Sequence, residues 1–375
     1  MSAPPKRLRR LPPGGATTAD RRSRIRGVCL SALLSMGLGS LAALSAQAAP
    51  VAEALQRPAV MVKAPERAAL LSAAQAGNRL VAVGERGLVL LSDDAGRSWR
   101  QAPCPVSVTL TTVRFADATQ GVAVGHGGTV LTTQDGGSSW QLRLDGRRLA
   151  TLAREAATTP EAQRDAERLV ADRPDKPLLD VVMWNAQRLL AVGAYGLAVH
   201  TEDGGQTWQP WMERLPNPKG LHWYVTRRRG DTLLLAGEQG LAVRSDDGGR
   251  TFRPLASPYR GSWFTGELAA DGSAVLAGLR GNVWRSTDGG GSWSQLPNPV
   301  PATVIAAATQ PDGGVLLLSQ AGALLRLQGE RLQPLKTPPL PLPTALLPLA
   351  EGRLLALGLT GLTTLTLPAP QEARP

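Results

Sequence analysis

Five aspartates recur in one eight-residue context, and an acidic residue repeated in this way could bind a metal ion or act as a general acid or base. The context is Ser/Thr-x-Asp-x-Gly-x-Ser/Thr-aromatic, here called the box, and it occupies residues 92–99, 133–140, 201–208, 245–252 and 286–293. The same residue types also stabilise a tight turn, because aspartate accepts backbone N–H groups ahead of it and glycine adopts a left-handed conformation. We therefore predict a structural role, with no catalytic residue, metal ligand or cofactor, for Asp94, Asp135, Asp203, Asp247 and Asp288.

A second pattern precedes each box: a short apolar strand that ends in Gly-x-x-Gly. Its first glycine is residue 84, 125, 193, 237 or 278, and two further units keep the strand around Ser319 and Gly358 after the box has decayed. The spacing is about 40 to 45 residues with one longer step, which is typical of a four-stranded propeller blade. The seven units predict an all-β, seven-bladed β-propeller.

The domain organisation follows from this repeat. We expect a signal peptide over residues 1–48, the propeller over 49–367 and a disordered tail over 368–375. The longer step holds apolar residues at helical spacing and predicts a helical hairpin, within residues 143–177, between blades two and three. The last unit has three obvious strands, and a closed ring leaves no exposed edge, so residues 59–63 are predicted to close it as an N-terminal fourth strand.

The first residues predict export. A basic run leads into an apolar run from Val28 to Leu44, and Ala46 and Ala48 offer small residues for cleavage after Ala48. The product would be periplasmic or secreted, or membrane-anchored if the signal stays uncut, and both the general and the twin-arginine routes stay open. The net charge of +11 includes this basic leader, and the remainder is too mildly basic to indicate nucleic-acid binding. Outside the leader Cys104 is the one cysteine, so no disulfide is expected.

Binding function is expected on the face that carries the Gly-x-x-Gly turns and the helical insertion, opposite the boxes, because loops on a rigid scaffold usually carry function. Two sets of residues are candidates for contact with a protein partner. The turns supply Arg86, His126, Tyr195, Glu238 and Arg280, and equal register in the third strands places Arg244 and Arg285 in a basic arc. Trp211 and Trp223 are predicted to be exposed, which would suit carbohydrate binding instead.

The boxes match the bacterial neuraminidase repeat, or Asp-box. Units of Ala-Val-Gly-x-x-Gly, a strand, and Thr-x-Asp-Gly-Gly-x-Thr-Trp resemble the photosystem II assembly and stability factor family of seven-bladed propellers over about residues 58–367. The resemblance implies a non-enzymatic factor in the lumen or periplasm that binds a membrane protein or complex subunit during assembly. We expect the chain to be a monomer. The alternatives are a sialidase-like glycoside hydrolase and a carbohydrate-binding propeller.

Overall fold

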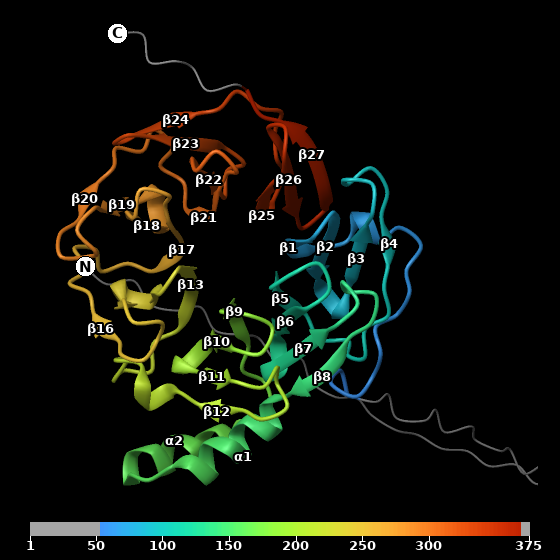
Figure 1. The fold of residues 1–375 in the computed structure, drawn as a ribbon, viewed down its shortest axis with the longest axis vertical. Helices are drawn as coiled ribbons and strands as arrows, with labels where there is room; N and C mark the ends of the chain where they lie inside the picture. Colours follow the sequence, from blue (N-terminus) through green and yellow to red (C-terminus); the bar gives the residue numbers. More distant parts are fainter. Residues whose placement is uncertain (1–52, 369–375) are drawn as a thin grey trace, which may run out of the picture. The chain divides into compact units, whose positions relative to one another are not determined.

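The computed structural model describes residues 53–368, and within them seven antiparallel sheets follow one another around a ring (Figure 1). Each sheet is one blade, and β1 of the first blade contacts β25 and β26 of the last, so the ring closes. The fold is therefore the predicted all-β, seven-bladed β-propeller. The predicted signal peptide, its cleavage site at Ala48 and residues 369–375 of the predicted tail lie outside the described residues.

The strands run outward from the centre of the ring in sequence order within each blade. The inner strands are β1 (Leu70–Ala76), β5 (Leu110–Phe115), β9 (Leu178–Met183), β13 (Trp223–Arg229), β17 (Trp263–Leu268), β21 (Val304–Thr309) and β25 (Pro343–Pro348). The second strands are β2 (Arg79–Gly84), β6 (Gly121–Gly125), β10 (Leu189–Gly193), β14 (Thr232–Gly237), β18 (Ala274–Gly278), β22 (Val315–Ser319) and β26 (Arg353–Gly358). The third strands are β3 (Val89–Ser92), β7 (Thr129–Thr133), β11 (Ala198–Thr201), β15 (Ala242–Ser245), β19 (Val283–Ser286), β23 (Leu324–Gln328) and β27 (Gly361–Thr366). The outer strands are β4 (Arg100–Gln101), β8 (Gln141–Leu144), β12 (Gln209–Pro210), β16 (Arg253–Pro254), β20 (Ser294–Gln295) and β24 (Arg331–Pro334).

The core lies between blades, which explains why the second strands are apolar on both faces. In β10 and β18 all five residues are buried, because each blade is covered by a neighbour on both sides. The buried residues form clusters that each join two adjacent blades; one, for example, unites Val182 and Trp223 of blades three and four. Cys104 is buried in the cluster between blades one and two.

The box turns are held by a repeated set of hydrogen bonds. In the fourth blade Ser245 Oγ donates to Asp247 Oδ1 at 2.8 Å, Gly249 N donates to Ser245 Oγ at 2.8 Å, and the amide and hydroxyl of Thr251 donate to the same carboxylate at 2.9 and 2.6 Å. The hydroxyl and amide of Thr251 hold the pKa of Asp247 well below its usual range. The other four boxes repeat these four bonds.

Glycine is required where a box meets the preceding blade. Gly290 has a φ of +88°, and a Cβ added there would lie 2.8 Å from the side chain of Leu255 in the blade before it. A side chain at this position would both strain the backbone and separate the two blades. The box therefore sets the spacing between blades as well as the turn.

The predicted closure by residues 59–63 is wrong. The last sheet has three strands, β25, β26 and β27, and the N-terminal segment lies instead against the exit of the first blade. Ala59 N donates to Cys104 O at 3.0 Å, and the side-chain amide of Gln101 accepts from Val62 N at 2.9 Å and donates to Val60 O at 3.0 Å. A glutamine amide offers both a donor and an acceptor, so it replaces the ladder that β27 would have supplied.

The longer interval between the second and third repeats contains the predicted helical hairpin. Helix α1 (Gly146–Ala156) is capped by Asp145, and α2 (Pro160–Ala171) begins with Pro160 after its cap Thr159, whose side chain accepts from Ala162 N at 3.1 Å. The hairpin lies outside the ring beside β12 (Figure 1), and it does not cover the disc. Over residues 53–368, neither this pair nor any other helix has the length and apolar character needed to cross a membrane.

Candidate protein-binding face

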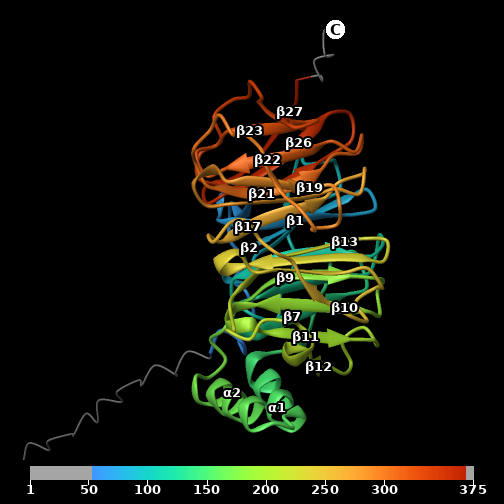
Figure 2. The same ribbon diagram turned by 90° about the vertical axis from the view of Figure 1, so that its left-hand side faces the viewer.

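The disc has two faces with different chemistry, seen edge-on in Figure 2. The box face carries the boxes and the turns between first and second strands, since the box amides of Gly136, Gly204 and Gly248 bond to carbonyls of those turns. The turn face carries the Gly-x-x-Gly turns, which form the short 3-10 segments η2 (Glu85–Gly87), η3 (His126–Gly128), η4 (Ala194–Gly196), η6 (Glu238–Gly240) and η7 (Leu279–Gly281). The connections between blades lie on the same face and include η5 (Met212–Arg214), and η1 (Pro65–Arg67) leads into the first blade.

Four of these turns hold a side chain in a conformation that favours glycine. The second variable residue has a left-handed φ of 52°, 55°, 53° and 56° in Arg86, Tyr195, Gln239 and Arg280, and all four side chains are exposed. This conformation costs roughly 1 kcal/mol or more for a residue with a Cβ. The second blade has Gly127 at this position, which shows that the turn forms without a side chain. Retaining four large side chains against that cost favours a role for them at the surface.

Tyr195 begins a row of rings that leads from the turn face to the inner strands. Its ring centroid is 4.8 Å from that of His222, His222 stacks on Tyr224 at 6.1 Å, and Tyr224 lies 5.3 Å from Phe264. Tyr224 and Phe264 are the second residues of the inner strands β13 and β17. The row therefore runs from an exposed tip, with Tyr195 59% exposed, to the half-buried start of two central strands.

Glu238 fixes the middle of this row. Its Oε2 accepts from His222 N at 3.2 Å and lies 2.8 Å from His222 Nδ1. These hydrogen bonds hold the pKa of Glu238 below its usual value, while burial, reinforced by the Glu238 carboxylate, raises the pKa of Tyr224. The Tyr224 phenol therefore stays a neutral hydrogen-bonding group at physiological pH.

The helical insertion reaches the same place through its last residues. Lys176 Nζ lies 4.8 Å from the centre of the Tyr195 ring and binds Asp172 at 2.5 Å, at the end of α2. Such a cation over an aromatic face is attractive by about 0.5–1 kcal/mol when exposed. The insertion therefore orients Tyr195 from the rim.

The other predicted residues divide between the two faces. His126 and Arg280 are exposed on the turn face with Arg86 and Tyr195. Arg244 and Arg285 lie toward the box face, largely buried, where Arg244 pairs with Asp246 at 2.7 Å and Arg285 pairs with Asp271 at 2.5 Å. The structure thus brings the turn residues to one face and holds the two arginines of the basic arc in ion pairs away from it.

A charged network crosses five inner strands on the way to the box face. Arg114 Nη2 donates to Asp180 Oδ1 at 3.1 Å, and Arg227 Nη1 donates to Asp180 Oδ2 at 2.8 Å. Arg227 Nε donates to Glu267 Oε1 at 2.9 Å, and Thr309 donates to Glu267 Oε2 at 3.1 Å. A glycoside hydrolase needs two carboxyl groups that flank the bond to be cleaved. Here the Arg227 guanidinium occupies the space between Asp180 and Glu267, so the arrangement ties blades together.

Both tryptophans that the sequence suggested for carbohydrate stacking are buried, so that prediction is wrong. Trp211 is 3% exposed and stacks on His200 with ring centroids 3.9 Å apart, and Trp223 lies in the core between blades three and four. A tryptophan on an inner strand, or directly after an outer strand, can bury its large apolar ring between two blades. Across residues 53–368 no group of three or more His, Cys, Asp or Glu side chains could hold a metal ion.

Sequence reasoning missed His222, Tyr224 and Phe264, as well as the charged network. The ring residues sit at or beside the start of consecutive inner strands. Of the charged residues, Arg114, Arg227 and Glu267 are fifth in their strands, whereas Asp180 is third in β9. The glycine that ends a second strand pairs with the first residue of the inner strand, as in Trp223↔Gly237 and Trp263↔Gly278. Aligning the inner strands by these glycines would have shown the ring residues and the shared position of Arg114, Arg227 and Glu267, but not Asp180.

Fold and site together define a seven-bladed β-propeller with an aromatic and cationic turn face. No protein-family model matches the sequence, and no curated protein matches it. Among solved structures, YCF48 bound to D1 peptide is 18% identical with a TM-score of 0.60, covering 84% of this chain and 98% of that chain. YCF48 from Cyanidioschyzon merolae is 15% identical with a TM-score of 0.58, covering 81% and 97%. Virginiamycin B lyase from Staphylococcus aureus is 10% identical with a TM-score of 0.57, covering 82% and 97%. At these identities the likeness establishes the fold.

Proposed function

We propose that this chain is a non-enzymatic, exported propeller whose turn face binds a protein partner, a membrane protein or a subunit of a membrane complex, during assembly. The observation that carries the proposal is the row Tyr195, His222, Tyr224 and Phe264. The turns of the same face also expose Arg86, Gln239 and Arg280 in a left-handed conformation. Trp, Tyr and Arg side chains are enriched among the residues that contribute most of the binding energy at protein interfaces. The likeness to YCF48, one structure of which holds D1 peptide, supports a peptide or protein ligand.

Three further points belong to the proposal. The hydrolase alternative loses support because Arg227 separates the candidate carboxylates, and the carbohydrate alternative because Trp211 and Trp223 are buried. Export rests on the sequence of residues 1–48, and N-terminal sequencing of the protein isolated from its host should begin at residue 49. A start at Met1 would contradict cleavage.

Site-specific photo-crosslinking tests the binding face. A photoreactive phenylalanine analogue replaces Tyr195 on the turn face, and the matched control replaces Gln206, an exposed residue of the same blade on the box face. In host cells we expect one dominant crosslinked membrane protein from position 195 and none from position 206. When the variant with the photoreactive residue at position 195 also carries Arg280→Ala, we expect the yield of this crosslinked product to fall. Equal crosslinking from both positions, or capture by position 206 alone, would contradict the turn face as the binding surface.

A further inference from the structure

Among residues 53–368, no strand pairs with the outer edge of β27 in the last blade. Every other blade covers the corresponding edge with a fourth strand, as β16 covers β15. The hairpin before each third strand is closed by a residue pair, Gly237 with Leu241 in blade four and Gly358 with Gly361 in blade seven. Counted from these pairs, Ala242 and Arg244, whose backbone groups face the outer strand, correspond to Leu362 and Thr364 of β27. Thr363 and Thr364 are exposed.

Neither end of the described chain pairs with this edge beyond its first residue, Gly361, which lies beside η1 at the turn face. Residues 59–63 are bound to the exit of blade one, and at the other end Leu367 N donates to Gly352 O while Pro368 O accepts from Arg326 of blade six. The sequence of β27, Gly-Leu-Thr-Thr-Leu-Thr, contains no charge and no proline. Native proteins commonly use charge or proline to protect a free edge, so this one is open to another strand.

The chain's own outer strands show what such a slot accepts. Five of them place a polar residue, then proline or glutamine, then an apolar residue: Arg-Gln-Ala102, Gln-Pro-Trp211, Arg-Pro-Leu255, Ser-Gln-Leu296 and Gln-Pro-Leu335. In each, the amide of the apolar residue donates to a carbonyl of the third strand, for example Leu255 N to Ala242 O at 2.9 Å. The matching acceptor in blade seven is Leu362 O.

The apolar residue of this motif lies against the box aromatic of the next blade. The rings of Trp211 and Phe252 are 6.3 Å apart, and Leu255 packs in one cluster with Trp293. The box aromatic that follows β27 is Trp99, which packs in one cluster with Leu362. Within residues 53–368 blade seven supplies no fourth-strand residue to Trp99, whose cluster holds the smaller Ala68 and Ala73.

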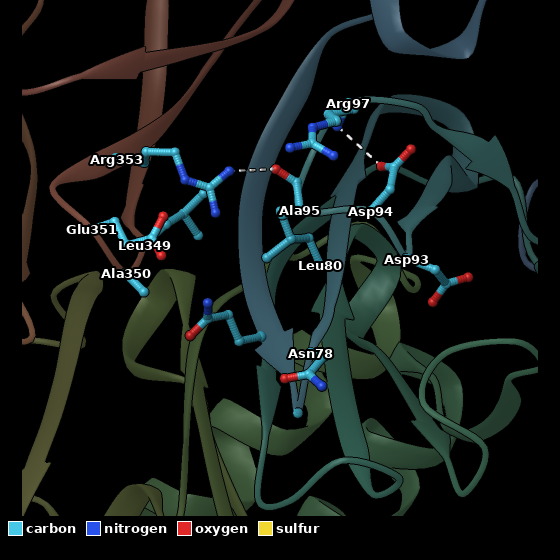
Figure 3. A pocket seen from close by; sticks show the side chains of 12 residues that line it. Asn78, Leu80, Asp93, Asp94, Ala95, Arg97, Leu349, Ala350, Glu351 and Arg353 are labelled. Carbon is cyan, nitrogen blue, oxygen red and sulfur yellow. Dashed lines mark hydrogen bonds between the residues drawn. The ribbon is translucent and has the colours of Figure 1, made fainter.

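The same seam opens on the box face. A cleft of about 500 Å³ separates the box turn of blade one, including Ala95 and Arg97, from the β25–β26 turn of blade seven, including Glu351 and Arg353 (Figure 3). Gly96, between two lining residues, would place a Cβ 3.2 Å from Thr364 Oγ1. A strand antiparallel to β27 starts at the box face, where this cleft leaves room for the residues that precede it.

We propose that the edge of β27 and Trp99 bind an extended segment of a partner protein by β-strand addition, with the sequence polar, proline or glutamine, leucine. The segment runs antiparallel to β27, its leucine amide donates to Leu362 O, its polar residue pairs with Thr364, and its leucine side chain packs on Trp99. Main-chain bonds supply affinity in this mode, and alternate side chains supply selectivity. This rim site is independent of the turn face.

A peptide that copies the chain's own outer strand, residues 250–257, is the probe. Its fluorescein-labelled form is titrated into the full chain by anisotropy, and hydrogen–deuterium exchange locates it. We expect saturable binding and slower exchange of β27. Thr364→Pro removes an outward N–H at a sheet edge, where proline is tolerated, and should weaken binding by about tenfold or more. Thr363→Val, which leaves the edge backbone intact, is the matched control, and a peptide with aspartate in place of leucine should not bind.

Several outcomes would overturn this assignment. Unchanged binding to the Thr364→Pro chain would do so, provided its thermal midpoint matches that of the Thr363→Val chain. Slower hydrogen exchange at β15 would also refute the site, because the peptide would then have replaced the strand β16 that it copies. Self-association of the chain through β27 would instead assign the edge to a second copy of the chain. Tyr195→Ala should leave peptide binding unchanged, so failure here is distinct from failure of the turn-face proposal.

Discussion

His200 makes the stability of this propeller depend on pH in a way that one substitution can remove. The ring is 1% exposed, stacks on Trp211 at 3.9 Å, and meets Trp184 edge-on at 6.0 Å. Its Nε2 accepts from Arg188 Nε at 3.4 Å, and its buried Nδ1 has no hydrogen-bond partner in the part of the chain that the structure describes. Burial, and then the charges of Arg188 and Arg214, lower the pKa of His200 to about 4.

The direction in which pH changes the stability follows from the difference in proton binding between the folded and unfolded chain. The unfolded chain binds a proton at this histidine with a pKa near 6.5, whereas the folded chain does not until about pH 4, so stability falls as pH falls from 6.5 to 4. Each unit of difference is worth about 1.4 kcal/mol, which gives a loss of roughly 2 kcal/mol between pH 7 and pH 5 and roughly 3 kcal/mol by pH 4. Below pH 4 both states are protonated and this contribution stops changing.

Urea unfolding at pH 7 and pH 5 measures this loss. His200→Phe keeps an aromatic ring against Trp211 but removes the proton, so the variant should lose about 2 kcal/mol less than the parent over the same interval. His126→Phe, which changes an exposed ring, is the matched control and should follow the parent. Equal pH dependence in the parent and His200→Phe would refute the assignment of the loss to this buried ring.

Two further substitutions test the packing of the ring. Ala95 stands where the other four boxes have glycine and has a φ of +59°. Ala95→Gly should therefore raise the free energy of unfolding in urea by about 0.5–1 kcal/mol, and Gly248→Ala, the reverse change, should lower it. A loss of stability in Ala95→Gly would contradict strain at this turn. Arg227→Met removes the shared partner of Asp180 and Glu267 and should lower the free energy of unfolding by about 2–4 kcal/mol, whereas Arg228→Met, on an exposed neighbour, should change it by less than about 0.5 kcal/mol. Equal effects of the two arginine substitutions would show that the network contributes nothing to stability.

The repeat made most of the fold predictable from sequence, because each blade is a local unit. The strands, the Gly-x-x-Gly turns and the caps at Thr159 and Pro160 depend on residues a few positions apart, so local patterns identify them. The hydrogen bonds of the five box carboxylates are also local, since each carboxylate accepts within its own turn. Residues close together in the sequence determine these features, so a single sequence is enough to predict them.

What failed involved a choice between distant partners. Residues 59–63 have the apolar composition of a strand, but two edges competed for them, and Gln101 offers a side-chain donor and acceptor that no strand pattern reveals. The burial of Trp211 depends on a histidine of the preceding strand and an aromatic of the next blade. Such contacts are set by the closing of the ring, which local periodicity does not describe.

The two faces of the disc differ in whether their exposed groups already have partners, and this difference favours the turn face for binding. On the box face arginines join one blade to the next: Arg253 donates to Gly289 O at 2.7 Å, Arg79 to Gly136 O at 3.2 Å, and Arg353 to Ala95 O at 3.2 Å across the closing seam. A partner that used these arginines would have to break contacts between blades. Tyr195 instead rests on neighbours that orient its ring and leaves most of its surface exposed. Binding at the turn face therefore costs no contact that the ring needs.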